Sequence, residues 1–385
     1  MGASLAEGGA LGELTFVSVY SGCGGMDLGF ARAGFTPLWA NDIDPLAIKT
    51  YNSAFSGQGP ASVGISHQAA CGDLLSEIWQ LDGIHADLVI GGPPCQGFSV
   101  AGKMDPDDPR SLHVRHFLDI VEKVRPRAFV MENVKALAQN RRWAEVRGLL
   151  FDRAEVLGFE TRMYVLNSSH FDVPQTRERM FLIGLAHGLN HVEPVPVSAE
   201  RPPTVRSLLA KLPSFGQPGN LGACPARVTL AKYPVLRRSP YAGLLFNGKG
   251  RALNLDVPAP TLPATMGGNS TPIIDQHALE TGNPDWILQY HNHLMSGGAP
   301  LNTAPQFLRR LTVEEAAAIQ TFPPNMVWHG AQTAVFRQIG NAVPPNLAYH
   351  VALALKASLD SRLRPSGKRT LTLKELTLTQ SLNTF

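Results

Sequence analysis

Short runs of apolar, mostly β-branched residues alternate with longer amphipathic segments through the first half of the chain. The apolar runs are bounded by turn-forming residues and predict strands at 14–20, 36–40, 86–90, 127–131, 161–166 and 180–185. Segments with helical spacing lie between them, near 25–34, 45–55, 113–124 and 142–157. This alternation predicts an α/β fold with a doubly wound, mostly parallel sheet. Because ligands of such folds bind beyond the carboxyl ends of the strands, the residues that follow each apolar run are candidates for function.

The pattern changes after about residue 187. Proline and glycine become frequent, apolar runs become short and irregular, and no internal repeat is visible. Helical spacing returns at 311–322 and, behind two prolines, at 346–359. We therefore expect four parts. A first domain covers 1–187, and a smaller irregular domain covers 188–334, with its variable part at about 188–305. A C-terminal helical segment follows at 335–360 and a polar tail at 361–385.

Composition narrows the class of protein. The chain has 385 residues, 44% of them hydrophobic, and its 34 Lys and Arg against 31 Asp and Glu leave a net charge of only +3. Its four cysteines form no CxxC pair and no metal-ligand spacing with histidine, so we expect neither a disulfide framework nor a metal site. We find no secretory leader and no apolar stretch of membrane-spanning length, which favours a cytoplasmic protein without membrane contact.

The distribution of charge is more informative than its sum. Between residues 201 and 255 there are nine Lys or Arg and no Asp or Glu. One interpretation is a solvated basic loop region; the other is a surface that neutralises phosphates, with Tyr233, Tyr241 and Phe246 interleaved to stack or wedge. On the second interpretation the candidate nucleic-acid contacts are Arg227, Lys232, Arg237, Arg238, Lys249 and Arg251.

Three features of the first half together favour a cofactor that contains adenosine. The first predicted strand leads into a glycine-rich turn, YSGCGGMDLGF (20–30), which is weak evidence alone because any tight turn needs glycine. The second strand ends at Asp42, where a carboxylate suits the two hydroxyls of a ribose. Asp73 lies in the loop before the third strand and could accept a hydrogen bond from an adenine amino group. The alternative for either aspartate is a helix N-cap.

Reactive side chains follow the next two strands. Cys95 stands in GGPPCQGFS (91–99), and its thiol is a strong nucleophile once a site promotes its ionisation; a buried structural cysteine is the alternative. Glu132 ends the following strand, where burial would raise its pKa and let it donate a proton near neutral pH. Arg177 and Arg179 alternate in QTRERMF (175–181) and could hold a carbonyl oxygen or a phosphate, or could pair with Glu178 at the surface.

The order of these motifs resembles the DNA (cytosine-5) methyltransferases. The resemblance rests on the glycine turn, NDID (41–44), PPCQGFS (93–99), ENV (132–134), QTRER (175–179), RRLTVEEAAAIQTFP (309–323) and QIGNAVPP (338–345). It covers nearly the whole chain except roughly 188–305. It implies an S-adenosyl-L-methionine-dependent enzyme with a Rossmann-like α/β domain, a small target-recognition domain, and a C-terminal helix that returns to complete the cofactor site.

The resemblance also implies roles for single residues. Cys95 corresponds to the nucleophile that adds to carbon 6 of cytosine, and Glu132 to the acid that engages ring nitrogen 3. Arg179 corresponds to the contact with the cytosine carbonyl oxygen, with Arg177 and Gln175 in the same wall, and the backbone carbonyl of Pro93 to the group that reads the exocyclic amine. The implied cofactor contacts are Tyr20, Gly22, Gly24, Gly25, Asp42, Ile43, Asp73 and Asn341.

Two positions depart from the usual pattern of that family. Members usually carry Asp-Leu-Phe before the glycine turn, whereas this chain has Ser18-Val19-Tyr20. Ile43 stands where an aromatic residue is frequent, so apolar packing on adenine would replace stacking. The polar segment 102–112 is expected to be a mobile loop that closes over the base and excludes water.

The expected partner is double-stranded DNA, from which a cytosine must be flipped at a cost of a few kcal/mol. The resemblance also suggests a bacterial monomer in a restriction-modification or epigenetic role, with a cognate restriction endonuclease that acts separately. Three alternatives stay open: a tRNA cytosine-5 methyltransferase with the same chemistry, a nucleotide-binding oxidoreductase, and a catalytically silent DNA-binding protein. The oxidoreductase would leave Cys95, ENV and QTRER without a role, and the silent protein predicts decay at catalytic positions that are intact here.

Overall fold

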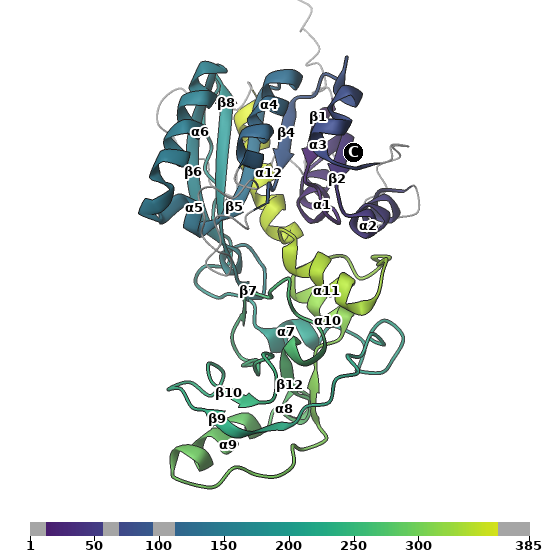
Figure 1. Ribbon diagram of the computed structural model, residues 1–385, viewed down its shortest axis with the longest axis vertical. Helices are drawn as coiled ribbons and strands as arrows, with labels where there is room; N and C mark the ends of the chain where they lie inside the picture. Colours follow the sequence, from purple (N-terminus) through teal and green to yellow (C-terminus); the bar gives the residue numbers. More distant parts are fainter. Residues whose placement is uncertain (1–12, 57–68, 95–111, 361–385) are drawn as a thin grey trace, which may run out of the picture.

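The computed structural model describes residues 13–56, 69–94 and 112–360. Cys95, most of the loop expected at 102–112, and the expected polar tail lie outside these ranges. The described chain forms two bodies, one above the other in Figure 1. We call them the upper body, built on the larger sheet and the helices that cover it, and the lower body, formed by the short strands and helices between residues 205 and 310.

A seven-stranded sheet is the frame of the upper body, with strand order β3-β2-β1-β4-β5-β8-β6. Neighbours from β3 to β5 are parallel, whereas β8 runs antiparallel to both β5 and β6. The strands are β1 (Leu14–Val19), β2 (Phe35–Asp42), β3 (Ala70–Cys71), β4 (Leu88–Gly91), β5 (Ala128–Val134), β6 (Phe159–Asn167) and β8 (Glu178–Ala186). The six predicted strands and the mostly parallel sheet are thereby confirmed.

Both faces of the sheet are buried, which is why its central strands are apolar throughout. Along β5, Phe129 and Met131 pack on the layer formed by α4 (His113–Val124) and α6 (Ala144–Val156), while Ala128 and Val130 face α1 (Gly25–Arg32) and α12 (Pro345–Leu359). Figure 1 shows α4, α5 (Lys135–Gln139) and α6 on one side and α12 across the other. The helices expected near 25–34, 45–55, 113–124 and 142–157 are confirmed as α1, α2 (Pro45–Phe55), α4 and α6.

Helix α12 lies so close to α1 that no side chain fits at Gly29. A Cβ atom there would stand 2.5 Å from the backbone oxygen of Pro345 and 2.6 Å from the Cβ of Ala348. The Arg32 guanidinium adds a cation–π contact, 3.8 Å from the centre of the Tyr349 ring. The last described helix is therefore packed against the helix that follows the glycine turn.

The lower body has its own apolar core around Phe246, Ile273, Ile287 and Leu308. Helices α10 (Val313–Ile319) and α11 (Gln332–Asn341) lie between the two bodies in Figure 1. A Thr312–Glu315 capping box starts α10. The elements of the lower body are α7 (Val205–Leu209), β9 (Leu230–Val235), β10 (Leu244–Phe246), β11 (Ala259–Pro260), β12 (Ile273–Asp275), α8 (Gln276–Thr281), α9 (Trp286–Met295) and β13 (Leu308–Arg310).

Candidate functional site

Three parallel neighbours in the sheet, β1, β4 and β5, end at the same edge. Val19 pairs with Gly91, and Gly91 pairs with Met131. The glycine turn after β1, Pro93 after β4 and Glu132 at the end of β5 therefore follow adjacent strand ends. This is the edge at which α/β sheets bind their ligands.

Glu132 and Arg179 form a largely buried ion pair at this edge. The Arg179 Nε atom lies 3.0 Å from Glu132 Oε1, and the two side chains are 16% and 12% exposed. Burial raises the pKa of Glu132, and the charges of Arg179 and Arg177 lower it in part. The carboxylate lies against Gly92, since a Cβ added there would stand 3.1 Å from Glu132 Oε2. Cys95 follows Gly92 by three residues, outside the described ranges.

A buried amide links β5 to the turn after β4. The Asn133 side chain donates from Nδ2 to the backbone oxygen of Pro93 at 3.1 Å, and its Oδ1 accepts from the backbone N–H of Val134. The Pro93 carbonyl, expected to read a base, therefore already accepts one hydrogen bond, and a carbonyl oxygen has a second lone pair. We did not single out Asn133 from the sequence, although it is the middle residue of ENV.

Arg177 and Gln175 have different partners from Arg179. Arg177 is 1% exposed and donates to the backbone oxygens of Gly340 and Asn341, at 3.0 and 3.3 Å. Gln175 donates to Gln320 Oε1 at 3.1 Å and accepts from the backbone N–H of Leu262 at the same distance. Both fasten the segment before β8 to the rest of the chain. Glu178, the alternative partner of the arginines, pairs with Lys135 instead.

The backbone of the turn after β1 has the left-handed conformations of a tight turn that can bind a small ligand. Tyr20, Gly22 and Gly24 all have positive φ, at 55°, 56° and 86°. Asp42 accepts from the backbone N–H of Gly22 and of Asp44, each at 2.8 Å, and burial raises its pKa. A Cβ placed on Gly22 would meet no described atom within 4 Å, so its Cα faces open space. A carboxylate braced beside open space fits a ligand that carries hydroxyl groups.

The other expected cofactor residues lie around this turn, on the neighbouring segments or at the end of α11. Ile43 follows Asp42 and is 70% exposed, an unusual setting for an isoleucine. Asp73 caps α3 (Leu74–Glu77), where its Oδ1 accepts from the Leu75 N–H, so the N-cap alternative holds for this aspartate. Asn341 is exposed at the end of α11. A Cβ atom added to Gly25 would stand 2.5 Å from the Val343 backbone oxygen, so no side chain fits there.

A histidine absent from the sequence-based expectations contacts the turn. The Tyr20 hydroxyl lies 3.0 Å from His113 Nδ1, and the two rings meet edge to face with centroids 5.5 Å apart. His113 is the first residue of α4. The pair is separated by 93 residues along the chain, so no local pattern could reveal it.

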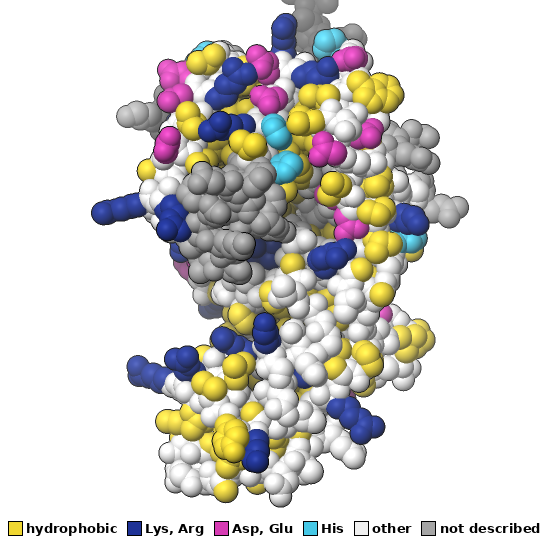
Figure 2. All heavy atoms as spheres, in the orientation of Figure 1, with side chains coloured by type: hydrophobic (Ala, Val, Ile, Leu, Met, Phe, Trp, Pro, Cys, Tyr) yellow, Lys and Arg dark blue, Asp and Glu magenta, His cyan; other side chains and the backbone are white. Residues whose placement is uncertain are grey.

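All six cations proposed for nucleic-acid contact are exposed, and Figure 2 shows Lys and Arg side chains scattered over the lower body on the face that it displays. Two of the expected aromatic contacts need correction. Phe246 is buried in the core of the lower body, and the Tyr241 hydroxyl donates to Asp285 Oδ2 at 2.8 Å. Tyr233, in contrast, is 82% exposed. Leu245 and Phe246 of β10 are both buried, and a strand of three residues is too short for its sequence to indicate this.

The loop between β9 and β10 is fastened to α9 at two points. His291 Nε2 lies 2.8 Å from the backbone oxygen of Arg237, and Asp285, which caps α9, holds the Tyr241 hydroxyl. Arg237 and Arg238 are exposed between these points. The loop therefore presents two guanidinium groups from a fixed backbone.

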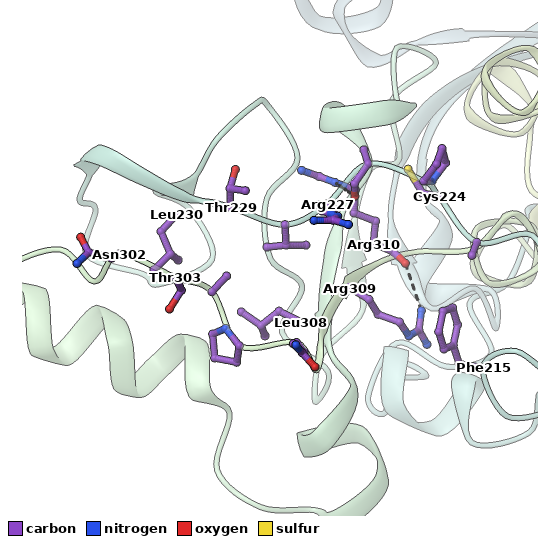
Figure 3. A pocket seen from close by; sticks show the side chains of 17 residues that line it. Phe215, Cys224, Arg227, Thr229, Leu230, Asn302, Thr303, Leu308, Arg309 and Arg310 are labelled. Carbon is purple, nitrogen blue, oxygen red and sulfur yellow. Dashed lines mark hydrogen bonds between the residues drawn. The ribbon is translucent and has the colours of Figure 1, made fainter.

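A groove of about 610 Å³ opens in the lower body (Figure 3). Thr229, Asn302 and Thr303 lie toward one end of it, and Arg309 lies beside the Phe215 ring at the other. Arg309 is committed to an ion pair with Glu315, whereas Arg227 on the same groove is exposed. The groove thus offers one exposed guanidinium among hydroxyl and amide groups.

The described ranges contain neither a metal-binding cluster nor a membrane-spanning helix. No three His, Cys, Asp or Glu side chains there form a group that could hold a metal ion. None of the described helices combines the length and the apolar character needed to cross a membrane.

Comparison with known proteins gives a consistent result. The family model described as C-5 cytosine-specific DNA methylase matches residues 14–220 and 266–357. The type II methyltransferase M1.HphI of Haemophilus parahaemolyticus is 33% identical over 356 residues, covering 89% of this chain and 87% of that protein. M.HindV of Haemophilus influenzae, also a type II methyltransferase, is 31% identical over 346 residues, covering 88% and 95%.

Solved structures show the same fold. A protein described as a DNA modification methyltransferase encoded within an E. coli prophage superposes with a TM-score of 0.60 at 22% identity, over 90% of this chain and 99% of that one. The Dnmt2 methyltransferase of S. pombe superposes with the same TM-score at 18% identity, over 90% and 99%. At these identities the likeness concerns the fold alone.

Proposed function

The chain belongs to the family of C-5 cytosine-specific DNA methylases, and from this premise we propose which of its residues carry the reaction. It is a DNA (cytosine-5) methyltransferase with the Rossmann-like fold of S-adenosylmethionine-dependent methyltransferases. The observation that carries the assignment of residues is the buried Glu132–Arg179 pair, which lies against Gly92 just before the cysteine motif.

Cys95 is the nucleophile in this proposal. Its thiolate forms a bond to carbon 6 of cytosine while Glu132 protonates ring nitrogen 3, which makes carbon 5 electron-rich. Carbon 5 then takes up a methyl group, whose bond to the donor sulfur breaks, and ring nitrogen 3 returns its proton to Glu132. Carbon 5 finally loses its own proton to a base, and the electrons of that C–H bond expel the thiolate. The raised pKa of Glu132 supports its role, because the carboxyl group must hold a proton to give one.

Arg179 has two roles in the proposal. It stays paired with Glu132 through Nε, and its Nη1 donates to the backbone oxygen of Glu178 at 2.8 Å, so Nη2 is the nitrogen that we propose meets the cytosine carbonyl oxygen. Arg177 and Gln175, in contrast, are positioning residues of the wall, since their polar atoms are engaged with the backbone and with Gln320. Asn133 fixes the Pro93 carbonyl that faces the exocyclic amine.

S-adenosyl-L-methionine, when bound, supplies the methyl group as an electrophile. The open space at Gly22 and the braced Asp42 carboxylate fit its ribose, and the exposed Ile43 fits its adenine. Asp73 can offer an adenine amine the carboxylate oxygen that does not cap α3. The further contacts that we propose, from their places on the turn and at the end of α11, are Tyr20, Gly24, Gly25 and Asn341.

Double-stranded DNA is the substrate, and we propose that the lower body is its target-recognition part. The acid-free stretch 201–255 supports this, because its exposed cations can neutralise phosphates. The fixed loop with Arg237 and Arg238 supports base reading in the major groove, where guanidinium forks recognise guanine. We further propose a bacterial, cytoplasmic monomer that protects DNA beside a separate restriction endonuclease. Similarity to type II methyltransferases of two Haemophilus species supports the bacterial origin.

The test is methylation in vitro. Purified protein is incubated with unmethylated genomic DNA and S-adenosylmethionine, with Cys95→Ser and a tRNA substrate in parallel, and the products are read by bisulfite sequencing. Methylation at one recurring short DNA motif, absent in the variant, is the expected result. A signal on tRNA alone would move the substrate to RNA, and no signal on either would leave a catalytically silent DNA-binding protein. The variant should keep its affinity for S-adenosylmethionine, because Cys95 is not among the adenosine-binding positions.

A further inference from the structure

Tyr20 and His113 form a hydrogen-bonded pair that the proposed reaction does not use. The Tyr20 hydroxyl lies 3.0 Å from His113 Nδ1, and the rings are in edge-to-face contact. Tyr20 also has a positive φ of 55°, uncommon for a residue with a side chain. A strained backbone of this kind persists only where surrounding contacts hold it.

The surroundings of the pair favour a neutral histidine that accepts the tyrosine proton. Burial and the neighbouring His116 lower the pKa of His113, so the imidazole is uncharged at neutral pH. Burial, with the nearby Asp73 and Asp119, raises the pKa of Tyr20, so the phenol keeps its proton. The hydroxyl can then donate to Nδ1.

The pair connects two elements at the cofactor edge of the sheet. Tyr20 belongs to the turn after β1, and His113 begins α4. The charge of Asp73, which caps α3, raises the pKa of both Tyr20 and His113. Of these three residues, Tyr20 and Asp73 are ones that we assign to the cofactor.

We propose that His113 is a positioning residue of the cofactor site. Its hydrogen bond holds the Tyr20 side chain beside the open space at Gly22, in the orientation that the bound cofactor meets. The inference rests on the proposed cofactor site and goes beyond it, because His113 is not among the residues that we assign to the cofactor. On this inference, cofactor affinity depends on a contact between two residues, Tyr20 and His113, that are 93 positions apart in the chain.

A double-mutant cycle on cofactor binding tests the proposal. Isothermal titration calorimetry measures the affinity of the full chain for S-adenosylhomocysteine in Tyr20→Phe, His113→Ala and the double variant. A net hydrogen bond of this kind is worth about threefold to tenfold in affinity. Each single variant is expected to lose that factor, and the double variant no more than one of them. Independent, multiplying losses would overturn the proposal.

Conservative replacements separate positioning from general packing. The amide of asparagine reaches the place of Nδ1, whereas that of glutamine reaches the place of Nε2. His113→Asn should therefore keep most of the affinity and His113→Gln should not. In steady-state assays the KM for S-adenosylmethionine should rise in Tyr20→Phe while kcat and the KM for DNA hold. Equal affinity in all His113 variants would contradict the proposal.

Controls separate this inference from the proposed function. Tyr241→Phe removes a comparable hydroxyl bond, 2.8 Å to Asp285 in the lower body, and should leave cofactor affinity unchanged. Thermal unfolding confirms that each variant is folded. If the unmodified chain binds no S-adenosylhomocysteine, the cofactor site itself is wrong, and this inference falls with it. If it binds and the variants bind equally well, only the role of His113 is refuted.

Discussion

Glu132 is under two opposing influences. Burial raises its pKa, and the adjacent Arg179 lowers it. Loss of a general acid typically reduces a rate by about 10²- to 10⁴-fold, so we expect Glu132→Gln to lower kcat by that order while cofactor affinity holds. Single-turnover methyl transfer and calorimetry measure the two effects. Activity within a few-fold of the unmodified enzyme would remove Glu132 from the reaction.

Asp27 predicts a pH dependence of stability. It is completely buried in the first turn of α1, accepts a hydrogen bond from the Tyr51 hydroxyl, and has a pKa raised by burial to about 6. A raised pKa means that the folded state binds the proton more tightly than the unfolded state does. The contribution to stability is therefore full below the unfolded pKa and is lost as the pH rises through about 6.

Asp27→Asn should remove this dependence, because an amide stays neutral. Between pH 4 and pH 8 the unmodified chain should lose roughly 1–3 kcal/mol more unfolding free energy than the variant does. Urea unfolding at the two pH values gives the difference. Parallel pH profiles of the two proteins would show that Asp27 does not titrate in this range.

At the scale of single residues, proximity was predictable only where the fold class supplies it. The sequence places Glu132 at the same edge of the sheet as the turn after β4, because the ends of neighbouring parallel strands meet, and β4 and β5 are such neighbours. Arg177 was expected beside Arg179, but it stands at the break between β7 (Gln175–Thr176) and β8, where strand alternation is interrupted. His113 meets Tyr20 across two elements, and no spacing in the chain records such a contact.

Helix packing gives a prediction with a matched control. Gly29→Ala places a methyl group within 2.6 Å of α12 atoms, which should force the helices apart and destabilise the chain by about 1–3 kcal/mol. Gly148→Ala on α6 makes the same change where an added Cβ meets nothing within 4 Å. That variant should be neutral or stabilised by up to about 1 kcal/mol. Chemical denaturation compares the two, and equal effects would mean that α1 and α12 are not in close contact.

Elements of the upper body were predictable because buried parallel strands are continuously apolar and short. The lower body was not. Its strands β9–β13 have two to six residues each and pair in two-stranded sheets or with β7 of the neighbouring segment. Such strands owe their stability to packing with distant parts of the chain, and the local pattern is therefore weak.

At the scale of the molecule, a net charge of +3 hides an uneven distribution. If the six exposed cations of the lower body contact phosphates, the logarithm of the DNA affinity should fall with the logarithm of salt concentration with a slope of up to about −5. Arg238→Ala should reduce the slope by about one if it contacts a phosphate. Arg153→Ala on α6, whose guanidinium pairs with Glu122, is the control and should change nothing.

Fluorescence anisotropy at a series of salt concentrations measures these slopes. A flat response in the unmodified protein would remove the region 201–255 from the interface. A loss of sequence preference in Arg238→Ala with an unchanged slope would instead indicate that its guanidinium reads a base.

The contact between α1 and α12 has a consequence for the time course of folding. The two helices are joined by more than 300 residues of chain, and together they form one of the two apolar layers that cover the central sheet. During synthesis that face of the sheet stays partly uncovered until residues 345–359 have emerged. Contacts of such large sequence separation form slowly, so we expect the upper body to become native last. Its completion should be the step of folding that depends most on chaperones.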